Sequence, residues 1–323
     1  AGTRKSDCRQ RWSSYRDLCL AAKIRIKEEV TMSVKNDYDR FIAEQKEVMK
    51  KELIQFAMLD QEKRYVEPFR IFGNVYYAGD SWVCVHVIDT GDGLLLIDSG
   101  NAQATAMLIH SIWSLGFNPA DIRWIILSHG HVDHIGGVNF LRKMFGCKVY
   151  LGEPDAVMFK EHPELSLVQE SGNSLEMLFE PDEAIREGDI LKFGNVTIEC
   201  KLVPGHTAGC VALFFDVSDG EKTVRAGYYG GFGFNTLTKE YLTEIGDPGF
   251  QMRKVYIESI DKVKDEKVEL FLGNHTENNK FFEKLEKLKA DPDGENPFIN
   301  DQDWKEYLEQ KKAELEVFSA KDC

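Results

Sequence analysis

Short stretches of alternating or continuous apolar residues recur along the chain, and this pattern predicts β-strands. The first lie at about residues 69–79, 82–88 and 93–100, where glycines and aspartates bound the apolar runs. Nearly continuous apolar runs at 121–130 and 147–152 predict more deeply buried strands. A second group of strands is expected at residues 190–205, 210–217, 223–231 and 268–274.

Apolar residues at three- and four-residue steps predict helices between these strands. Residues 102–115 place Leu108 and Ile112 on one apolar face, and Gly116 supplies a stop. Because strands alternate with helices, we expect an α/β fold with its functional residues on loops at strand ends. Other helices are expected at residues 135–146, 153–161, 249–265, 277–289 and 301–318, and a mixed loop at 162–189.

The two ends of the chain differ from its centre. Residues 1–31 are polar and irregular, and we interpret them as lying upstream of a natural start at Met32. Apolar residues at helical spacing between 33 and 60 predict one amphipathic helix. The expected organisation is an irregular segment (1–31), an N-terminal helix (32–66), a main domain (67–290) and a C-terminal helical tail (291–323).

Composition narrows the function classes. The chain has 323 residues and a formal net charge of -14, which argues against nucleic acid as a partner. It has no apolar run long enough to cross a membrane. Its seven cysteines include no CxxC pair, which favours a reducing compartment. We therefore expect a cytoplasmic protein, or a periplasmic or secreted one if a leader was removed.

The sequence SHGHVDHIGG, directly after an apolar strand, is the strongest chemical signal. Alternate residues leaving a strand point the same way, so His129 and His131 can share one site. The next turn directs Asp133 and His134 to a neighbouring point, and one loop could therefore serve two metal ions. Imidazole and carboxylate ligands suit zinc.

Two isolated histidines follow later strands and can supply the missing ligands. His206 lies in LVPGHTAG and His275 in LFLGNHT, each directly after an apolar run. The remaining histidines lie in a strand pattern, on a helix and in a polar loop, and we interpret them as core or surface residues: His86, His110 and His162.

The segments LSHGHVDHIGG, PGHTAG and LLLIDSG, with the late histidine after a strand, resemble the metallo-β-lactamase fold superfamily over residues 69–288. The resemblance implies an α/β fold, a four-layer αββα sandwich, here with an N-terminal helical extension. It also implies two metal sites, the first with His129, His131 and His206 and the second with Asp133, His134 and His275.

One feature of many superfamily members is absent. They carry a metal-bridging aspartate after the strand that follows PGHT, but residues 222–239 contain no aspartate, glutamate or cysteine. A set of five histidines and one aspartate without a bridge is similar to the third subclass (B3) of metallo-β-lactamases. The alternative is that a carboxylate from elsewhere folds back into the site, for which the candidates are Asp216, Asp219 and Asp247.

The resemblance implies a hydrolase in which two Zn²⁺ ions activate a shared water, with iron or manganese as alternative metals. We expect a small-molecule substrate whose cyclic amide is opened, most simply a β-lactam, and a homodimer is compatible with the helical ends. The alternatives are a cytoplasmic hydrolase of a lactone, thioester or phosphoester, an iron-dependent oxidoreductase, and a non-catalytic metal-binding scaffold.

Further residues are candidates for supporting roles. Asp133 can act as a general base, and Tyr228 or Tyr229 can contact the substrate carbonyl, although core packing explains at least one of them. Asp98 in LIDSG resembles the buried acid that supports the metal loop, and a turn aspartate is the alternative. Two residues between the first strands can form the lip of the site: Ser81 and Trp82.

Overall fold

A computed structural model describes residues 55–56 and 60–322. The chain divides into two compact units, Ala1–Lys63 and Arg64–Cys323, and the division along the sequence falls within helix α3 (Gln61–Arg64). The irregular segment expected at 1–31 lies outside the described residues, as does nearly all of the helix expected at 33–60. The second unit contains both sheets and is described by itself.

The first sheet has its strands in chain order, β1 to β7. Strands β1 to β4 pair antiparallel, and β4 to β7 pair parallel. Parallel neighbours need crossover connections, which explains why helical periodicity separates the apolar runs in this part of the sequence. The strands are β1 (Phe69–Phe72), β2 (Val75–Tyr77), β3 (His86–Asp89), β4 (Leu94–Ile97), β5 (Ile122–Ile126), β6 (Lys148–Gly152) and β7 (Glu183–Ile185).

The second sheet has the order β12-β11-β10-β9-β8. Strands β8 to β11 form an antiparallel meander, and β12 adds parallel to β11. Gly194 begins the two-residue turn between β8 and β9, where its φ of 55° is costly for other residues. The strands are β8 (Ile190–Phe193), β9 (Val196–Leu202), β10 (Val211–Ser218), β11 (Thr223–Tyr228) and β12 (Leu270–Leu272).

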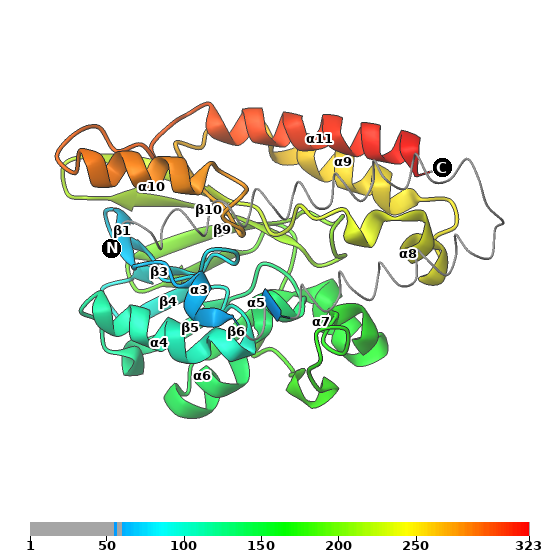
Figure 1. Cartoon of the computed structure of the whole chain (residues 1–323), viewed down its shortest axis with the longest axis horizontal. Coiled ribbons are helices and arrows are strands. Elements are labelled where there is room, and N and C mark those ends of the chain that lie inside the picture. Colours follow the sequence, from blue (N-terminus) through cyan, green and yellow to red (C-terminus); the bar gives the residue numbers. More distant parts are fainter. Residues whose placement is uncertain (1–54, 57–59, 323) are drawn as a thin grey trace. The chain divides into compact units, whose positions relative to one another are not determined.

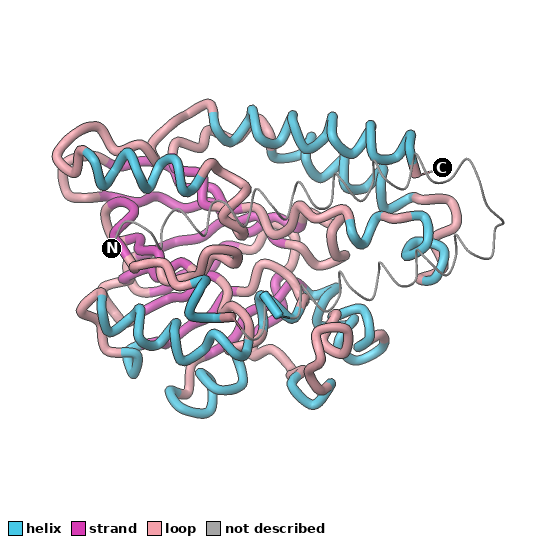
Figure 2. Tube along the Cα trace, viewed as in Figure 1, coloured by secondary structure: helices cyan, strands magenta, loops and turns pink. Residues whose placement is uncertain are grey.

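Three hydrophobic clusters define the layers of this unit. One fills the space between the sheets and includes Ile97 and Leu213. The second joins the outer face of the first sheet to α4 and α6, and the third joins the outer face of the second sheet to α9 and α11. Figures 1 and 2 show these helices on either side of the stacked strands. The predicted αββα sandwich is therefore confirmed.

The helices match the expected ranges closely, but short elements were not predicted, among them α5, where a turn was expected, β7 and α8. Strand β7 lies within the expected loop 162–189, and α8 lies within a glycine-rich segment; each is too short to produce a recognisable period. No helix between residues 60 and 322 is long and apolar enough to cross a membrane. The helices are α4 (Thr105–Ser114), α5 (Val132–Ile135), α6 (Val138–Phe145), α7 (Glu153–Glu161), α8 (Lys239–Glu244), α9 (Gln251–Val263), α10 (Phe281–Ala290) and α11 (Asp303–Lys321). Shorter 3₁₀ turns are η2 (Ala102–Ala104), η3 (Pro119–Asp121), η4 (Pro163–Ser166), η5 (Leu175–Met177) and η6 (Asn235–Leu237).

Helix α11, expected as part of a C-terminal tail, is packed into the outer layer of the second sheet. Trp304 is 1% exposed, and its indole nitrogen donates to the Val263 carbonyl at 2.9 Å. The buried Lys284 ammonium of α10 pairs with Asp303 at the start of α11. We therefore describe Arg64 to Asp322 as one compact unit.

His86 in strand β3 is as buried as three of the predicted ligand histidines, but it lies outside the predicted ligand set. Its Nε2 donates to the Gly273 carbonyl at 2.9 Å, and burial lowers its pKa from 6.5 to about 4. Because the folded pKa is lowered, the neutral ring stabilises the fold above pH 6.5, and this contribution is lost as the pH falls through about 4.

We expect His86→Gln to make the fold less sensitive to acid. Between pH 7 and pH 5, His86 takes up a proton in the unfolded chain but not in the folded protein. This difference accounts for about 2 kcal/mol of the unfolding free energy that is lost over that pH range. Urea unfolding at both pH values should therefore show a drop smaller by about that amount in the variant. The matched control is His110→Gln, because His110 is exposed on α4. Equal drops in the wild type and His86→Gln would contradict the assignment.

Candidate metal centre

The loop that follows β5 carries four of the six predicted ligands. The chain leaves the first sheet at the carboxyl end of β5, where α/β folds place functional residues. Asp98, after the neighbouring strand β4, accepts a hydrogen bond from the Ser128 backbone N–H at 2.7 Å and ties the loop to the sheet. His131 caps the one-turn helix α5, which contains Asp133 and His134.

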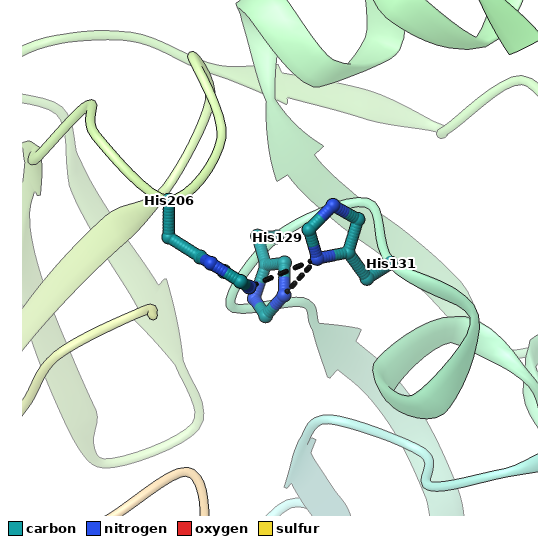
Figure 3. Close-up of side chains that lie close together, drawn as sticks. All are labelled: His129, His131 and His206. Carbon is teal, nitrogen blue, oxygen red and sulfur yellow. Dashed lines mark hydrogen bonds between the residues drawn. The ribbon is translucent and has the colours of Figure 1, made fainter. Parts of the chain in front are cut away.

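His129, His131 and His206 bring three imidazole nitrogens together. The His131 Nδ1 lies 3.1 Å from the His129 Nε2 and 2.9 Å from the His206 Nε2. Figure 3 shows that His206 enters from a separate loop, the one that follows β9. The first predicted group of residues is thus brought together from both sheets.

The chemistry of these three nitrogens fits a bound cation. A neutral imidazole carries one proton, so the His131 Nδ1 can donate a hydrogen bond to only one of its two neighbouring nitrogens. In at least one of the two nitrogen pairs, the lone pairs of both atoms would then face each other. Tetrahedral zinc with Zn–N bonds of about 2.0–2.1 Å would place such nitrogens about 3.3 Å apart. The observed separations of 2.9 and 3.1 Å are close to that value.

Asp133, His134 and His275 form a second group beside the first. The Nε2 atoms of His134 and His275 are 3.2 Å apart, and Asp133 Oδ2 lies 3.4 Å and 3.5 Å from them. Ligand atoms of His129, Asp133 and His134 also lie within 4.8 Å of one another. The two groups are therefore adjacent, and two cations could bind side by side.

The second nitrogen of most of these rings is held by the protein, which decides the tautomer. A carbonyl facing the ring requires an N–H there, so His206 and His275 present unprotonated Nε2 atoms to their groups when neutral. His131 differs, because its buried Nε2 has no partner among the described residues. The partners are Ser128 Oγ for His129 (3.0 Å), Asp98 Oδ2 for His134 (2.7 Å), the Gly233 carbonyl for His206 (2.9 Å) and the Trp82 carbonyl for His275 (3.1 Å).

Burial sets the charge of the first group. It lowers the pKa of His129 and His131 well below the usual value and that of His206 to about 4, so these rings are neutral at pH 7. Neutral imidazole is the form that binds metals. His134 differs: burial alone would lower its pKa, but Asp133 and Asp98 raise it to about 10.

Asp98 supports the loop rather than acting only as a turn residue. Its fully buried carboxylate accepts from the Ser128 N–H, pairs with His134 and accepts from the Tyr228 hydroxyl at 2.6 Å. Its φ of 64° is in the left-handed region, which aspartate tolerates better than most residues. Of the two interpretations of Asp98, these contacts favour support of the metal loop.

The end of β11 and the residues that follow it contain no carboxylate, and position 231 has no room for one. Gly231 lies under the His206 ring, where an added Cβ would be 2.6 Å from Cδ2. Each alternative aspartate is engaged elsewhere: Asp216 pairs with Arg225, Asp219 accepts from backbone N–H groups of its own turn, and Asp247 accepts from the first backbone N–H groups of α9. None of the three folds back into the groups of ligands.

Tyr228 and Tyr229 are both fully buried. Burial raises the pKa of each phenol well above 10, and Tyr228 donates to Asp98. Tyr229 stacks on Phe232 with ring centroids 4.5 Å apart. Contact of either phenol with a substrate stays a prediction, and this burial favours supporting roles.

The segment of Ser81 and Trp82 borders the second group. The Trp82 ring is partly exposed and lies 5.5 Å from the His275 ring between centroids, and the Ser81 carbonyl accepts from the Thr276 hydroxyl at 2.9 Å. Val83 forms a β-bridge with His275. This segment therefore supports the loop that carries His275 and places an aromatic ring beside it.

Several supporting residues were not found from the sequence. Asp155 in α7 is completely buried between the loops of His129 and His206, and the buried ion pair of Arg64 and Asp80 lies next to Trp82. In the sequence, the proline directly before Asp155 indicates only the start of a helix. Arg64 and Asp80 are charged, and charged residues are normally expected at the surface. Gly233 acts through its carbonyl, for which the sequence carries no signal.

Part of the sequence is similar to known proteins. Residues 83–220 match the model of the Metallo-beta-lactamase superfamily. The chain is 31% identical over 132 residues to the hydroxyacylglutathione hydrolase GloC of Haemophilus influenzae, a match that covers 40% of this chain and 59% of that protein. The chain spans about half the length of the curated relatives it matches.

Two solved structures are similar over most of the chain. BJP-1, a subclass B3 metallo-beta-lactamase of Bradyrhizobium japonicum, has a TM-score of 0.71 and 27% identity, covering 82% of this chain and 97% of that one. The FEZ-1 metallo-beta-lactamase of Legionella gormanii has a TM-score of 0.71 and 26% identity, covering 80% of this chain and 97% of that one. The similarity therefore extends well beyond residues 83–220.

Proposed function

We propose that this chain, a member of the metallo-beta-lactamase superfamily, is a dinuclear zinc hydrolase that opens the cyclic amide of a β-lactam. The observation that carries the proposal is the pair of adjacent ligand groups without a carboxylate at the end of β11. Two solved structures with similar folds are metallo-beta-lactamases, one of them of subclass B3, which supports the choice of substrate.

The residues have distinct roles in this proposal. His129, His131 and His206 would hold the first ion, and Asp133, His134 and His275 the second. Bound ions would lower the pKa of a water molecule and polarise the substrate carbonyl. The Asp133 side chain is 16% exposed, so its carboxylate can accept the proton of the attacking water. Trp82 beside His275 can cover an apolar part of the substrate and exclude water.

Thioester hydrolysis is the second candidate, because the curated relatives include hydroxyacylglutathione hydrolases. Many superfamily members, glyoxalase II among them, carry a metal-bridging aspartate after this strand, but residues 222–239 of this chain contain no aspartate or glutamate. We therefore rank it below β-lactam hydrolysis.

An activity panel with metal analysis tests the proposal. We expect the full chain to bind about two zinc ions and to hydrolyse nitrocefin and imipenem, with activity lost on EDTA treatment and restored by Zn²⁺. A lactone, a phosphoester and a hydroxyacylglutathione thioester are assayed in parallel. Metal-dependent cleavage of one of these without β-lactam turnover would replace the substrate assignment. Iron in place of zinc would favour an oxidoreductase, and less than one metal per chain would favour a scaffold.

A further inference from the structure

Asp155 contacts both loops that carry the first group of histidines, although it belongs to neither. It lies in the first turn of α7, and its side chain is completely buried. We propose that Asp155 is a positioning residue that sets the separation of these two loops and thereby the geometry of the first metal site. The inference rests on the proposed function only in taking His129, His131 and His206 as metal ligands.

The contacts of Asp155 are with residues adjacent to the ligands. Its Oδ2 accepts from the Gly130 backbone N–H and from the Thr207 hydroxyl, each at 2.7 Å. Its Oδ1 accepts from the Gly209 backbone N–H at 2.7 Å. Gly130 lies between His129 and His131 in the chain, and Thr207 directly follows His206. One carboxylate therefore joins the two loops within one residue of all three ligands.

This connection matters because the loops extend from different sheets. His129 and His131 follow β5 of the first sheet, and His206 follows β9 of the second. The separation of 2.9 Å between the His131 Nδ1 and the His206 Nε2 thus depends on how far apart the loops are held. A backbone bond from the Val211 N–H to the Ser128 carbonyl (3.0 Å) also joins them, but only through main-chain atoms.

Close packing keeps the carboxylate in one place. An added Cβ on Gly209 would be 2.7 Å from Asp155 Oδ1, and one on Gly152 would be 2.1 Å from the Gly209 carbonyl oxygen. A longer acid would not fit this space without shifting the backbone. Hydrogen bonds to an ionised acceptor are also stronger than neutral ones, so the charge of Asp155 strengthens all three contacts.

The second metal group has its own carboxylate, which provides a matched comparison. Asp98 pairs with His134, a ligand of the second group, and accepts from the Ser128 N–H. Asp155 and Asp98 are both completely buried and each accepts three hydrogen bonds or polar contacts. We therefore expect the two asparagine variants to affect different metals: Asp155→Asn the first and Asp98→Asn mainly the second.

Zinc and cobalt binding to the full chain tests this inference independently of any substrate. Asp155→Asn keeps the size but replaces one carboxylate oxygen with an N–H₂ group, which then faces either the Gly209 N–H or the Gly130 N–H and Thr207 hydroxyl. We expect it to weaken the first metal about 10–100-fold, as changes to outer partners of ligands do. Asp98→Asn should weaken mainly the second metal. Zn²⁺ affinities come from chelator competition, and the Co²⁺ spectrum distinguishes the three-histidine site from the site with a carboxylate.

Thr207 supplies a milder pair of variants in case Asp155→Asn does not fold. Thr207→Val removes the hydroxyl donor to Asp155 at similar volume, and Thr207→Ser retains it. We expect Thr207→Val to weaken the first metal and Thr207→Ser to bind as the wild type does. Asp155→Asn or Thr207→Val with wild-type affinities at both sites, whatever the change in unfolding temperature, would overturn the inference.

The outcomes also separate this inference from the proposed function. If the wild type binds two ions but hydrolyses no β-lactam, the substrate proposal fails and the role of Asp155 is still decided by the affinities. If the wild type binds no metal, both fail.

Discussion

His206→Ala is expected to empty the first metal site and to leave about one zinc ion per chain. Each group contains three protein ligands, and zinc bound by two of them is held far less tightly. Because changes to residues that only orient ligands already reduce affinity or activity 10–100-fold, loss of a ligand should reduce hydrolysis by on the order of 100-fold or more. Elemental analysis together with a hydrolysis assay measures both effects.

His275→Ala is the complementary change and should empty mainly the second site. His275 Nε2 lies 3.2 Å from His134 Nε2 and 3.5 Å from Asp133 Oδ2, so its loss leaves those two residues as the remaining ligands. The matched control is His162→Ala, because His162 is exposed and pairs only loosely with Glu164. Unchanged metal content and activity in His275→Ala would mean that the sixth ligand lies elsewhere, and the similarity to subclass B3 sites would lose its basis.

Asp80→Ala is expected to lower the free energy of unfolding by about 3–5 kcal/mol, because it leaves the buried Arg64 guanidinium without its carboxylate. The two groups are 2.6 Å apart, and their side chains are 0% and 4% exposed. Burial lowers the pKa of Arg64 and raises that of Asp80 in spite of their attraction, so each charge depends on the other. Denaturant unfolding of the single and double variants measures the coupling.

The same change should also weaken the second metal site. Asp80 Oδ1 accepts from the backbone N–H groups of Trp82 and Val83, each at 2.8 Å, and the Trp82 carbonyl accepts from the His275 Nδ1. Loss of the carboxylate frees this turn and therefore the orientation of the His275 ring.

An exposed ion pair on the surface serves as the control for the buried ion pair of Arg64 and Asp80. Arg123 and Asp92 are 2.8 Å apart with side chains 54% and 61% exposed, and Asp92→Asn should change stability by less than about 1 kcal/mol. Replacing Arg64 and Asp80 together with apolar residues should be less harmful than Asp80→Ala alone. If Asp80→Ala were as mild as Asp92→Asn, the buried pair would not be a structural determinant.

The sequence was sufficient to predict most strands and helices, because each of these elements buries one face and the burial repeats with a regular period. The ranges expected for α7 and for the strands that precede His129, His206 and His275 agree with the structure. Strand β7 and helix α8 were missed, since three and six residues are too few to establish a period.

The two groups of metal ligands could also be predicted from the sequence, because their residues lie either in one loop or directly after a strand. His129, His131, Asp133 and His134 lie within six positions, so their proximity follows from local geometry alone. His206 and His275 are distant in the chain, but each directly follows a strand, and strands of packed sheets bring their ends together.

The sequence by itself thus determined the order of elements, the ligand types and the absence of a carboxylate between residues 222 and 239. Only the tertiary structure decided what holds the ligands in place: Asp155 across two sheets, Asp98 against His134, the Gly233 carbonyl, and Arg64 with Asp80 behind Trp82. The reason is physical. A charged side chain on a helix or turn is normally solvated, and only the burial produced by packing distant segments makes its hydrogen bonds determine the geometry of a site.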